Sequence, residues 1–395
     1  MVKTVVLFCI PARGHVQRAV LMTRELVAAG AIVHVYSGHE YAGEFGRAGG
    51  TFHDLFAGRP LDAADDQSVP IPCRHVTFAA VFVDAIVTEV AELSPDVIVY
   101  GTFAVVAVLV AVALGVPRVA LCAGHNMAPD VALAQIHGDP RVAVSRRCRD
   151  AVEMIRKRFG IENASPFSYL DSLSPVLNVI PEPREFLREE DLSPFKPCDF
   201  FGSVDPLRFG PEVREQEDGR LRVFASFGTI AHRYYSVTID SAIRAILDAV
   251  RDEPDTECVV GLGGATPERT LRVPPNASLQ AYVDQSAVLQ TSDVFITHHG
   301  LNSTHESIFA LTPMVSYPIF ADQPGLASRC QELGVAIPLT SNVRGDVDSR
   351  SVKDAIARVI GMRDSMRDRL REAKLWEMGA VAARPMVAAR ILALA

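Results

Sequence analysis

Short runs of β-branched and aromatic residues alternate with helical stretches along the whole chain, and this alternation occurs twice. Helical periodicity fills the intervals: Val16, Val20 and Val27, for example, fall on one face of a helix. Strands that alternate with helices form parallel sheets covered by helices. The sequence therefore predicts an α/β protein with two such sheets. The expected strands are 4–10, 32–37, 51–55, 96–100, 118–121 and 176–180 in the first half, and 221–227, 258–262, 278–283, 294–297, 314–317 and 336–339 in the second.

The stretch between the two halves interrupts this alternation. It contains Pro206, Gly210 and Pro211, followed by a charged run without periodicity, as expected of a linker. The length of 395 residues also favours two domains, because one hydrophobic core rarely extends beyond about 250–300 residues. Pro385 predicts two helices in the tail with a kink or break between them. We predict domains over 1–205 and 220–380, a linker over 206–219, and a C-terminal helix over 381–395 that packs back on the first domain.

Composition and charge narrow the range of partners. The formal net charge is −8 without a long basic run, which argues against nucleic acid or an anionic membrane as a partner. No uninterrupted apolar stretch has the length of a membrane span, and no small-residue cleavage site follows the apolar start of the chain. The seven cysteines are scattered without a C-x-x-C pair, as expected of reduced thiols. We expect a cytoplasmic protein that binds small molecules, and a homodimer is left open.

Parallel sheets bind ligands beyond the carboxyl ends of their strands, so residues that directly follow strands carry most weight. In the second half, Ser226, Gly228 and Thr229 follow the first strand, where small residues and hydroxyl groups can approach a phosphate. A plain glycine turn explains this segment equally well. Asp322 and Gln323 follow a later strand, and their side chains suit the hydroxyls of a hexose, with a polar turn as the equal alternative.

The segment 297–306 (Thr-His-His-Gly-Leu-Asn-Ser-Thr-His-Glu) is more specific. It follows an apolar strand, turns at Gly300 and enters a helix for which Asn302 or Ser303 would be the N-cap. The N-terminus of such a helix presents free N–H groups and the positive end of its dipole to a diphosphate. His298 beside it can donate a further hydrogen bond, and Glu306 can accept from ribose hydroxyls.

The same segment has two other interpretations. One is a capped helix with incidental histidines. The other is a zinc site of His298, His299 and His305, which is disfavoured because no carboxylate or cysteine partner stands at zinc-like spacing. In addition, His298 and His299 point to different sides if they continue the strand.

Together these segments resemble the nucleotide-sugar-dependent glycosyltransferases of the GT-B fold, particularly bacterial enzymes that glycosylate natural products and their plant relatives. The similarity spans nearly the whole chain and is strongest over 297–306 and the pair Asp322-Gln323. It implies two Rossmann-like parallel-sheet domains that face each other across a cleft. It also implies a donor-sugar site at Asp322 and Gln323, and a site for the donor nucleotide and diphosphate made of Ser226, Gly228, Thr229, Tyr282, Val283, Gln285, His298, Gly300, Asn302, Ser303, Thr304 and Glu306.

Three positions in this half depart from the family's pattern. Tyr282 replaces the tryptophan of the base-binding segment, and Asp284 replaces its proline. We expect Tyr282 to stack on uracil or thymine, with a purely structural tyrosine at a strand end as the alternative. Leu326 stands where an asparagine usually follows the Asp-Gln pair, which we expect to alter the loop rather than the chemistry.

By the same resemblance, the amino-terminal half supplies the acceptor site and the general base. Gly14-His15 follows the first strand and is similar to the family's glycine-histidine motif, whose histidine deprotonates the acceptor hydroxyl. A neutral imidazole near its ordinary pKa suits this role, and a structural histidine at a helix start is the alternative. Arg18 stands in place of a common proline. Gly101 stands where many relatives carry the aspartate that orients the histidine, and Asp96 lies at the opposite end of that strand. The sequence leaves open which group replaces the carboxylate.

The resemblance implies inverting transfer of a hexose from a UDP- or dTDP-sugar to a hydroxyl or similar nucleophile of a small, largely apolar natural product. It implies no metal and no cofactor beyond the nucleotide sugar as co-substrate. Two alternatives stay open: a sugar-nucleotide epimerase of the same fold, and a catalytically inactive accessory homologue, for which Gly101 is the main argument. The acceptor and the choice between uracil and thymine are also open. Phe78, Phe82, Phe103, His125, Asn126 and Met127 are expected to line an apolar acceptor pocket.

Overall fold

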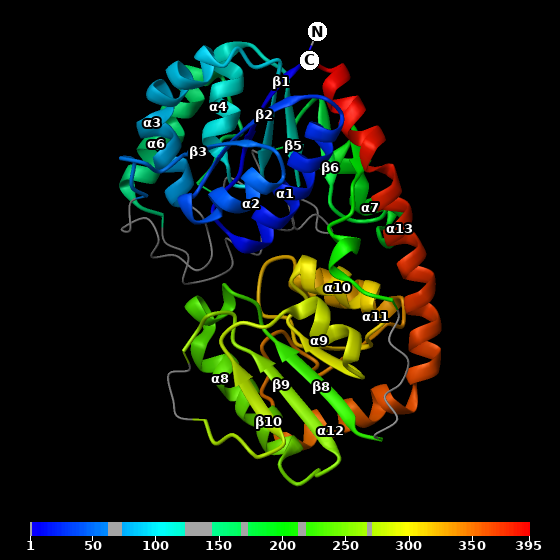
Figure 1. Cartoon of the computed structure of the whole chain (residues 1–395). Coiled ribbons are helices and arrows are strands. Elements are labelled where there is room, and N and C mark those ends of the chain that lie inside the picture. Colours follow the sequence, from blue (N-terminus) through cyan, green and yellow to red (C-terminus); the bar gives the residue numbers. More distant parts are fainter. Residues whose placement is uncertain (1, 62–72, 123–143, 167–172, 212–218, 267–270) are drawn as a thin grey trace. The chain divides into compact units, whose positions relative to one another are not determined.

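The computed structural model describes residues 2–61, 73–122, 144–166, 173–211, 219–266 and 271–395. The chain divides into two compact units, the first made of Met1–Ser203 with Ala380–Ala395 and the second of Val204–Gly379. Each unit is built around its own parallel sheet (Figure 1). The prediction of two Rossmann-like parallel-sheet domains is therefore confirmed.

The sheet of the first unit has seven strands in the order β3-β2-β1-β4-β5-β6-β7. All of its strand pairs are parallel. The three-residue edge strand β7 was not expected from the sequence, because so short a run gives no periodic signal. The strands are β1 (Thr4–Phe8), β2 (Ile32–Ser37), β3 (Thr51–Asp54), β4 (Val97–Gly101), β5 (Arg118–Leu121), β6 (Leu177–Ile180) and β7 (Cys198–Phe200).

Helices cover both faces of this sheet, which is why its central strands are almost continuously apolar. The helices are α1 (Arg13–Ala28), α2 (Ala42–Arg47), α3 (Cys73–Glu92), α4 (Val105–Leu114), α6 (Arg146–Phe159) and the short α7 (Glu189–Leu192). Val16 of α1 and Phe45 of α2 share one core cluster with Val5 and Val33 of the sheet. The helices α3, α4 and α6 contact one another as a second group (Figure 1).

The sheet of the second unit has six parallel strands in the order β10-β9-β8-β11-β12-β13. The strands are β8 (Leu221–Ser226), β9 (Thr256–Gly261), β10 (Ala277–Gln280), β11 (Val294–Thr297), β12 (Met314–Ser316) and β13 (Ala336–Pro338). The helices are α8 (Ala231–Val250), α9 (Gln285–Thr291), α10 (Leu301–Ala310), α11 (Gln323–Glu332), α12 (Ser349–Gly361) and α13 (Arg363–Ala393). α8 is kinked at Tyr235, whose φ and ψ are not helical.

The last helix, α13, runs through Pro385 without a break, so the predicted break is wrong. Proline removes one helical hydrogen bond, but packing in the first unit holds this segment. Arg384 donates to the carbonyl oxygens of Phe201 at 2.8 Å and Gly202 at 3.1 Å. Apolar side chains of the same segment are buried in the core cluster of the first sheet, namely Val387, Ala388 and Ile391.

No helix among the described residues combines the length and the apolar character needed to span a lipid bilayer.

Candidate active site

In the second unit, the carboxyl ends of β8 and β11 lie side by side. The order of the strands reverses here, since β9 and β10 lie beyond β8 while β12 and β13 lie beyond β11. Ser226 and Thr297 are paired in register, so the turns that follow both strands start at the same edge. Open α/β sheets bind their ligands at such a reversal. The two segments that the sequence singles out for a diphosphate therefore meet at this edge.

The imidazole of His298 is enclosed by two glycines from these two turns. A Cβ atom at either Gly228 or Gly300 would lie 2.6 Å from Nε2 of His298, which no real contact allows. Gly228 also has a φ of +74°, a conformation that favours glycine. Burial lowers the pKa of His298 to about 4. The ring is therefore neutral at pH 7 and carries one N–H instead of a positive charge, and a hydrogen bond with the Ser226 backbone partly offsets the effect of burial.

Helix α10 begins directly behind this turn, with Gly300 as its N-cap. The predicted N-cap at Asn302 or Ser303 is wrong, because both residues already lie inside the first turn and no side chain caps the helix. The first N–H groups of a helix have no acceptor within it, and the dipole adds partial positive charge at that end. An uncapped helix start beside a neutral donor is suited to a diphosphate.

His299 faces the interior, away from this turn. Its Nδ1 lies 3.1 Å from the hydroxyl of Thr304 and its Nε2 lies 2.8 Å from the hydroxyl of Ser316. Burial, followed by the neighbouring His298, lowers the pKa of His299 to about 3. The two histidines do not continue the strand, since β11 ends at Thr297 and His299 has a φ of +59°. The Thr304 side chain is fully buried, so its hydroxyl serves this internal network.

A chain of polar side chains continues along α10. Nε2 of Gln285 donates to the hydroxyl of Ser303 at 3.1 Å and to Oε2 of Glu306 at 2.6 Å. Oε1 of Glu306 accepts from Nη1 of Arg208 at 3.0 Å. Gln285, Ser303 and Glu306, which the resemblance assigns to the nucleotide, therefore lie together in the structure. Arg208, which the sequence did not single out, joins them through Glu306. Arg208 was missed because it lies in the expected linker.

Tyr282 lies beside a glycine-rich turn after β9. Its side chain is 77% exposed, as a ring that stacks on a base must be. A Cβ atom at Gly264 would lie 2.3 Å from the Tyr282 hydroxyl oxygen, and one at Gly263 would lie 2.3 Å from the carbonyl oxygen of Gly228. The glycines at 263 and 264 therefore bring the Tyr282 turn against the Gly228 turn. Sequence reasoning missed them, although two adjacent glycines after a strand are a readable signal. Val283 packs near Gly261.

Asp322 and Gln323 lie at the start of α11, after β12. Asp322 is half-buried at the N-cap, and its side chain makes no capping bond. Oε1 of Gln323 accepts from the backbone N–H groups of Ile319 at 2.9 Å and Phe320 at 3.1 Å. The Gln323 side chain therefore stabilises the loop between β12 and α11. Leu326, in place of the usual asparagine, is fully buried and packs in the core.

In the first unit, His15 lies in the first turn of α1, immediately after β1. The strand order reverses between β1 and β4, so this is again a ligand-binding edge. Burial first, then the charge of Arg18 and the neighbouring His75, lower the pKa of His15 well below its usual 6.5. The expectation of an ordinary pKa is therefore wrong. His75 of α3 was not singled out from the sequence, because only the fold brings it near His15.

Gly101 ends β4, the strand beside β1. A Cβ atom there would have its nearest neighbour, the carbonyl oxygen of Phe8, at 3.7 Å, which is ordinary contact. Asp96 lies at the other end of β4, as expected, where its Oδ2 accepts from the backbone N–H of Thr4 at 2.7 Å. Arg18 is the charged residue that acts on His15, because burial lowers the pKa of His75 to about 3 and so keeps that neighbouring ring neutral at pH 7.

Comparison with known proteins agrees with this geometry. Residues 244–389 match the family described as the C-terminal domain of erythromycin biosynthesis protein CIII-like proteins. The uncharacterized UDP-glucosyltransferase YdhE of Bacillus subtilis is 25% identical over 369 residues, which cover 91% of this chain and 90% of YdhE. The glycosyltransferase of kitacinnamycin has the same fold, with a TM-score of 0.78, 20% identity, and coverage of 100% of this chain and 99% of that one. The spinosyn rhamnosyltransferase SpnG, solved with thymidine diphosphate, has a TM-score of 0.65, 17% identity, and coverage of 98% and 99%.

The chain is a GT-B glycosyltransferase homologue. We therefore class it as an enzyme of glycosyl transfer, and the resemblance read from its motifs is confirmed.

Aromatic side chains of the first unit form two groups, one at His15 and one on α3. The ring of Phe103 lies 5.5 Å from that of His15. On α3, the rings of Phe78 and Phe82 are 5.1 Å apart, and Phe56 packs on Phe78 at the same distance. Three of the expected acceptor-pocket residues, His125, Asn126 and Met127, lie outside the described residues.

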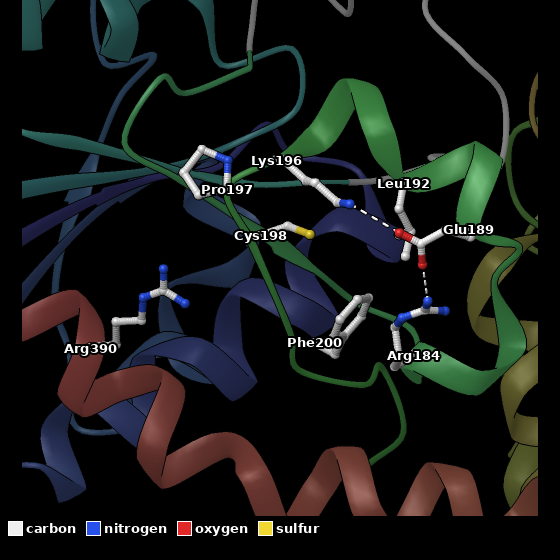
Figure 2. Close-up of a pocket in the computed structure, with 8 residues that line it drawn as sticks. All are labelled: Arg184, Glu189, Leu192, Lys196, Pro197, Cys198, Phe200 and Arg390. Atoms are coloured by element: carbon white, nitrogen blue, oxygen red, sulfur yellow. Dashed lines mark hydrogen bonds and ion pairs between the residues drawn. The ribbon is translucent and has the colours of Figure 1, made fainter.

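A shallow hollow of the glycosyltransferase lies elsewhere in the first unit, beside the edge strand β7 (Figure 2). Glu189 is bonded there to both Lys196 and Arg184, and Arg390 pairs with Asp199. None of the residues predicted from the sequence lines this hollow. The hollow is therefore separate from the edge at β8 and β11 and from the turn that carries His15.

The three histidines of the α10 segment do not converge. His305 is buried and pairs with Glu377 of α13, whereas His298 and His299 face the turn and the interior. Within the described ranges, no group of three or more His, Cys, Asp or Glu side chains is placed to hold a metal ion.

Proposed function

We propose that this glycosyltransferase moves a hexose, with inversion at the anomeric carbon, from a UDP- or dTDP-sugar to a hydroxyl group of a small, largely apolar acceptor. The single observation that carries the proposal is the anion site of the second unit. There the neutral imidazole of His298 is held between Gly228 and Gly300, in front of the uncapped start of α10.

On the donor side, negative charge develops on the diphosphate as the bond to the sugar breaks. N–H groups at the start of α10 and the His298 donor would stabilise that charge without a metal ion, because they are fixed before the reaction begins. Tyr282 would stack on the base, and Asp322 would bind sugar hydroxyls. Gln323 and Thr304 would not contact the donor. Gln323 would hold the loop that carries Asp322, and Thr304 would hold the His299 ring.

On the acceptor side, His15 would remove the proton of the attacking hydroxyl. Because its pKa is lowered, His15 is neutral over the cellular pH range and is always ready to accept a proton. The same shift makes it a weak base. Burial and the charge of Arg18 would oppose the imidazolium that forms, so acceptors that release a proton easily, such as phenols, should react faster than aliphatic alcohols.

Names of relatives support the donor class. YdhE is called a UDP-glucosyltransferase, and SpnG was solved with thymidine diphosphate. Both nucleotides therefore stand as candidates for this chain, and both would leave as a diphosphate.

The test combines purified protein with UDP- and dTDP-hexoses and a mixed panel of phenols and aliphatic alcohols, read by mass spectrometry. We expect an acceptor that has gained one hexose, with release of one nucleoside diphosphate. His15→Ala is the matched control, because it should bind the donor and form little product. Nucleotide release without any glycoside would contradict transfer and favour an epimerase. No turnover with any pair, despite nucleotide binding, would favour an inactive accessory homologue.

A further inference from the structure

The loop between β12 and α11, residues 317–322, contains a strained residue beside the proposed sugar ligand. We call it the sugar loop, because it ends at Asp322. Ala321, directly before Asp322, has a φ of +54°, in the left-handed region that residues other than glycine rarely adopt. Such a conformation costs energy and persists only where the surrounding structure holds it. Gln323 provides part of that support from the start of α11.

Arg344 holds the sugar loop from a second loop, which lies between β13 and α12. Its Nη1 donates to the carbonyl oxygen of Ile319 at 2.5 Å, and its backbone N–H donates to that of Pro318 at 3.4 Å. The hydroxyl of Tyr317 donates in the opposite direction, to the carbonyl oxygen of Gly345 at 2.9 Å. Arg344 itself has a φ of +56°, so each of the two loops contains a strained residue. Three hydrogen bonds therefore link these loops to each other.

The guanidinium of Arg344 also contacts α8. Its Cζ lies 5.0 Å from the centre of the Tyr235 ring, at a distance typical of a cation–π contact. The same ring stacks on Phe320 of the sugar loop, with 5.6 Å between the ring centres and 17° between their planes. Tyr235 is only 7% exposed and is the residue at which α8 is kinked. The sugar loop is therefore held through its backbone by Arg344 and through Phe320 by Tyr235.

Arginine can make both of these contacts at once, because a planar guanidinium donates hydrogen bonds from its edge and stacks through its face. The ammonium group of lysine is a compact charge without such a plane. The segment 228–235 also connects this cluster to the diphosphate turn. Its first residue, Gly228, packs against His298, and its last residue, Tyr235, packs against the sugar loop.

Building on the proposed sugar site, we propose that Arg344 is a positioning residue for glycosyl transfer. It fixes the sugar loop through the carbonyl of Ile319 and the ring of Tyr235, so that Asp322 holds the donor sugar in line for attack at the anomeric carbon. Arg344 acts through the loop and forms no bond in the reaction. A misplacement of reacting atoms by about 1 Å can lower a rate about a hundredfold. Loss of Arg344 should therefore lower turnover, while the nucleotide keeps its contacts at the start of α10.

The test measures kcat and KM for the donor at saturating acceptor, and the affinity for uridine and thymidine diphosphates by calorimetry. We expect Arg344→Met to lower kcat by about tenfold to a hundredfold and to leave the affinity for both diphosphates within about twofold. Arg344→Lys keeps the charge without the planar fork, so its kcat should fall between those of the wild type and Arg344→Met. Arg350→Met is the matched control, since Arg350 is 89% exposed and pairs with Asp354 within α12. The control should leave kcat and both affinities unchanged.

Arg344→Gln, which removes the charge and shortens the side chain, replaces Arg344→Met if that variant does not fold. An unchanged kcat in the folded variant would overturn the inference while leaving the proposed function intact. An equal loss of kcat and of diphosphate affinity would also overturn it, because Arg344 would then support the whole nucleotide site and not the sugar loop. If the wild-type chain forms no glycoside with any donor, the proposed function fails, and this inference fails with it.

Discussion

Replacing Gly101 by aspartate should raise the pKa of His15 and turn a weak base into a stronger one. Gly101 ends the strand next to the one that precedes His15, and a Cβ atom there meets only ordinary contact at 3.7 Å. Burial lowers the pKa of His15, and the positive charge of Arg18 lowers it further. A carboxylate would oppose both.

The size of the effect follows from Coulomb's law. A carboxylate in contact with an imidazolium, at about 4 Å, contributes about 4 kcal/mol at an effective dielectric constant of about 20. At about 1.36 kcal/mol per unit, this corresponds to a rise of up to about three pKa units. Asparagine at the same position has the same shape without the charge. Gly101→Asn is therefore the matched control for any effect of the side chain's bulk.

The assay is the pH dependence of kcat/KM with a phenol and with an aliphatic alcohol. In the wild-type enzyme, the loss of activity at low pH should occur well below 6.5, because the pKa of His15 is lowered. In Gly101→Asp the loss should move to higher pH, and the rate with the alcohol should approach that with the phenol. His15→Ala should lower turnover by about a hundredfold to ten-thousandfold and leave donor binding nearly intact.

Two results would refute this reasoning. A fully active His15→Ala enzyme would remove His15 from the chemistry. A wild-type profile that falls near pH 6.5 or above would show that the surroundings of His15 do not lower its pKa. An unchanged Gly101→Asp profile would show that the new carboxylate does not reach the imidazole.

Three further predictions concern the donor side. His298→Ala should weaken nucleoside diphosphate binding by roughly 1.5–3 kcal/mol, the value of a hydrogen bond to a charged group. Gly300→Ala should weaken it as well, because the new Cβ atom would displace the imidazole of His298. Gly361→Ala is the control, since its Cβ atom would meet nothing within 4 Å and should leave binding unchanged. Unchanged calorimetric affinity in a folded His298→Ala chain would rule out this diphosphate site. Activity should persist in excess EDTA, since a helix start and side-chain donors oppose the diphosphate charge; loss in EDTA that magnesium or manganese restores would refute this. Asp322→Ala should depress turnover more than affinity for the bare nucleotide, and equal loss of both would move Asp322 out of the sugar site.

The fold could be predicted from the sequence because its signals are local. Apolar runs mark the strands, and their alternation with helices implies parallel sheets. The different surroundings of His298 and His299 do not follow from strand alternation, because β11 ends at Thr297 and His299 has a φ of +59°. Pro385 shows the limit of such reasoning, because the packing of Arg384 and its neighbours outweighs a local helix breaker.

The details of the site depend on contacts between distant segments, which no local pattern shows. The low pKa of His15 depends mainly on burial, which only the packed fold produces, and the His75 ring near it lies sixty residues away along the chain. The engagement of Glu306 depends on Arg208, which lies in a segment that reads as a linker. The motif does not show whether the Thr304 hydroxyl is buried or exposed. In the structure it is buried, because it contacts the His299 ring in the interior.

The most direct measurement of the central claim is a crystal structure of this chain with a bound nucleoside diphosphate. The account predicts the phosphates at the start of α10, with one oxygen within hydrogen-bond distance of His298 and the base on Tyr282. A diphosphate bound elsewhere in the second unit, away from the turns that contain Gly228 and Gly300, would contradict it.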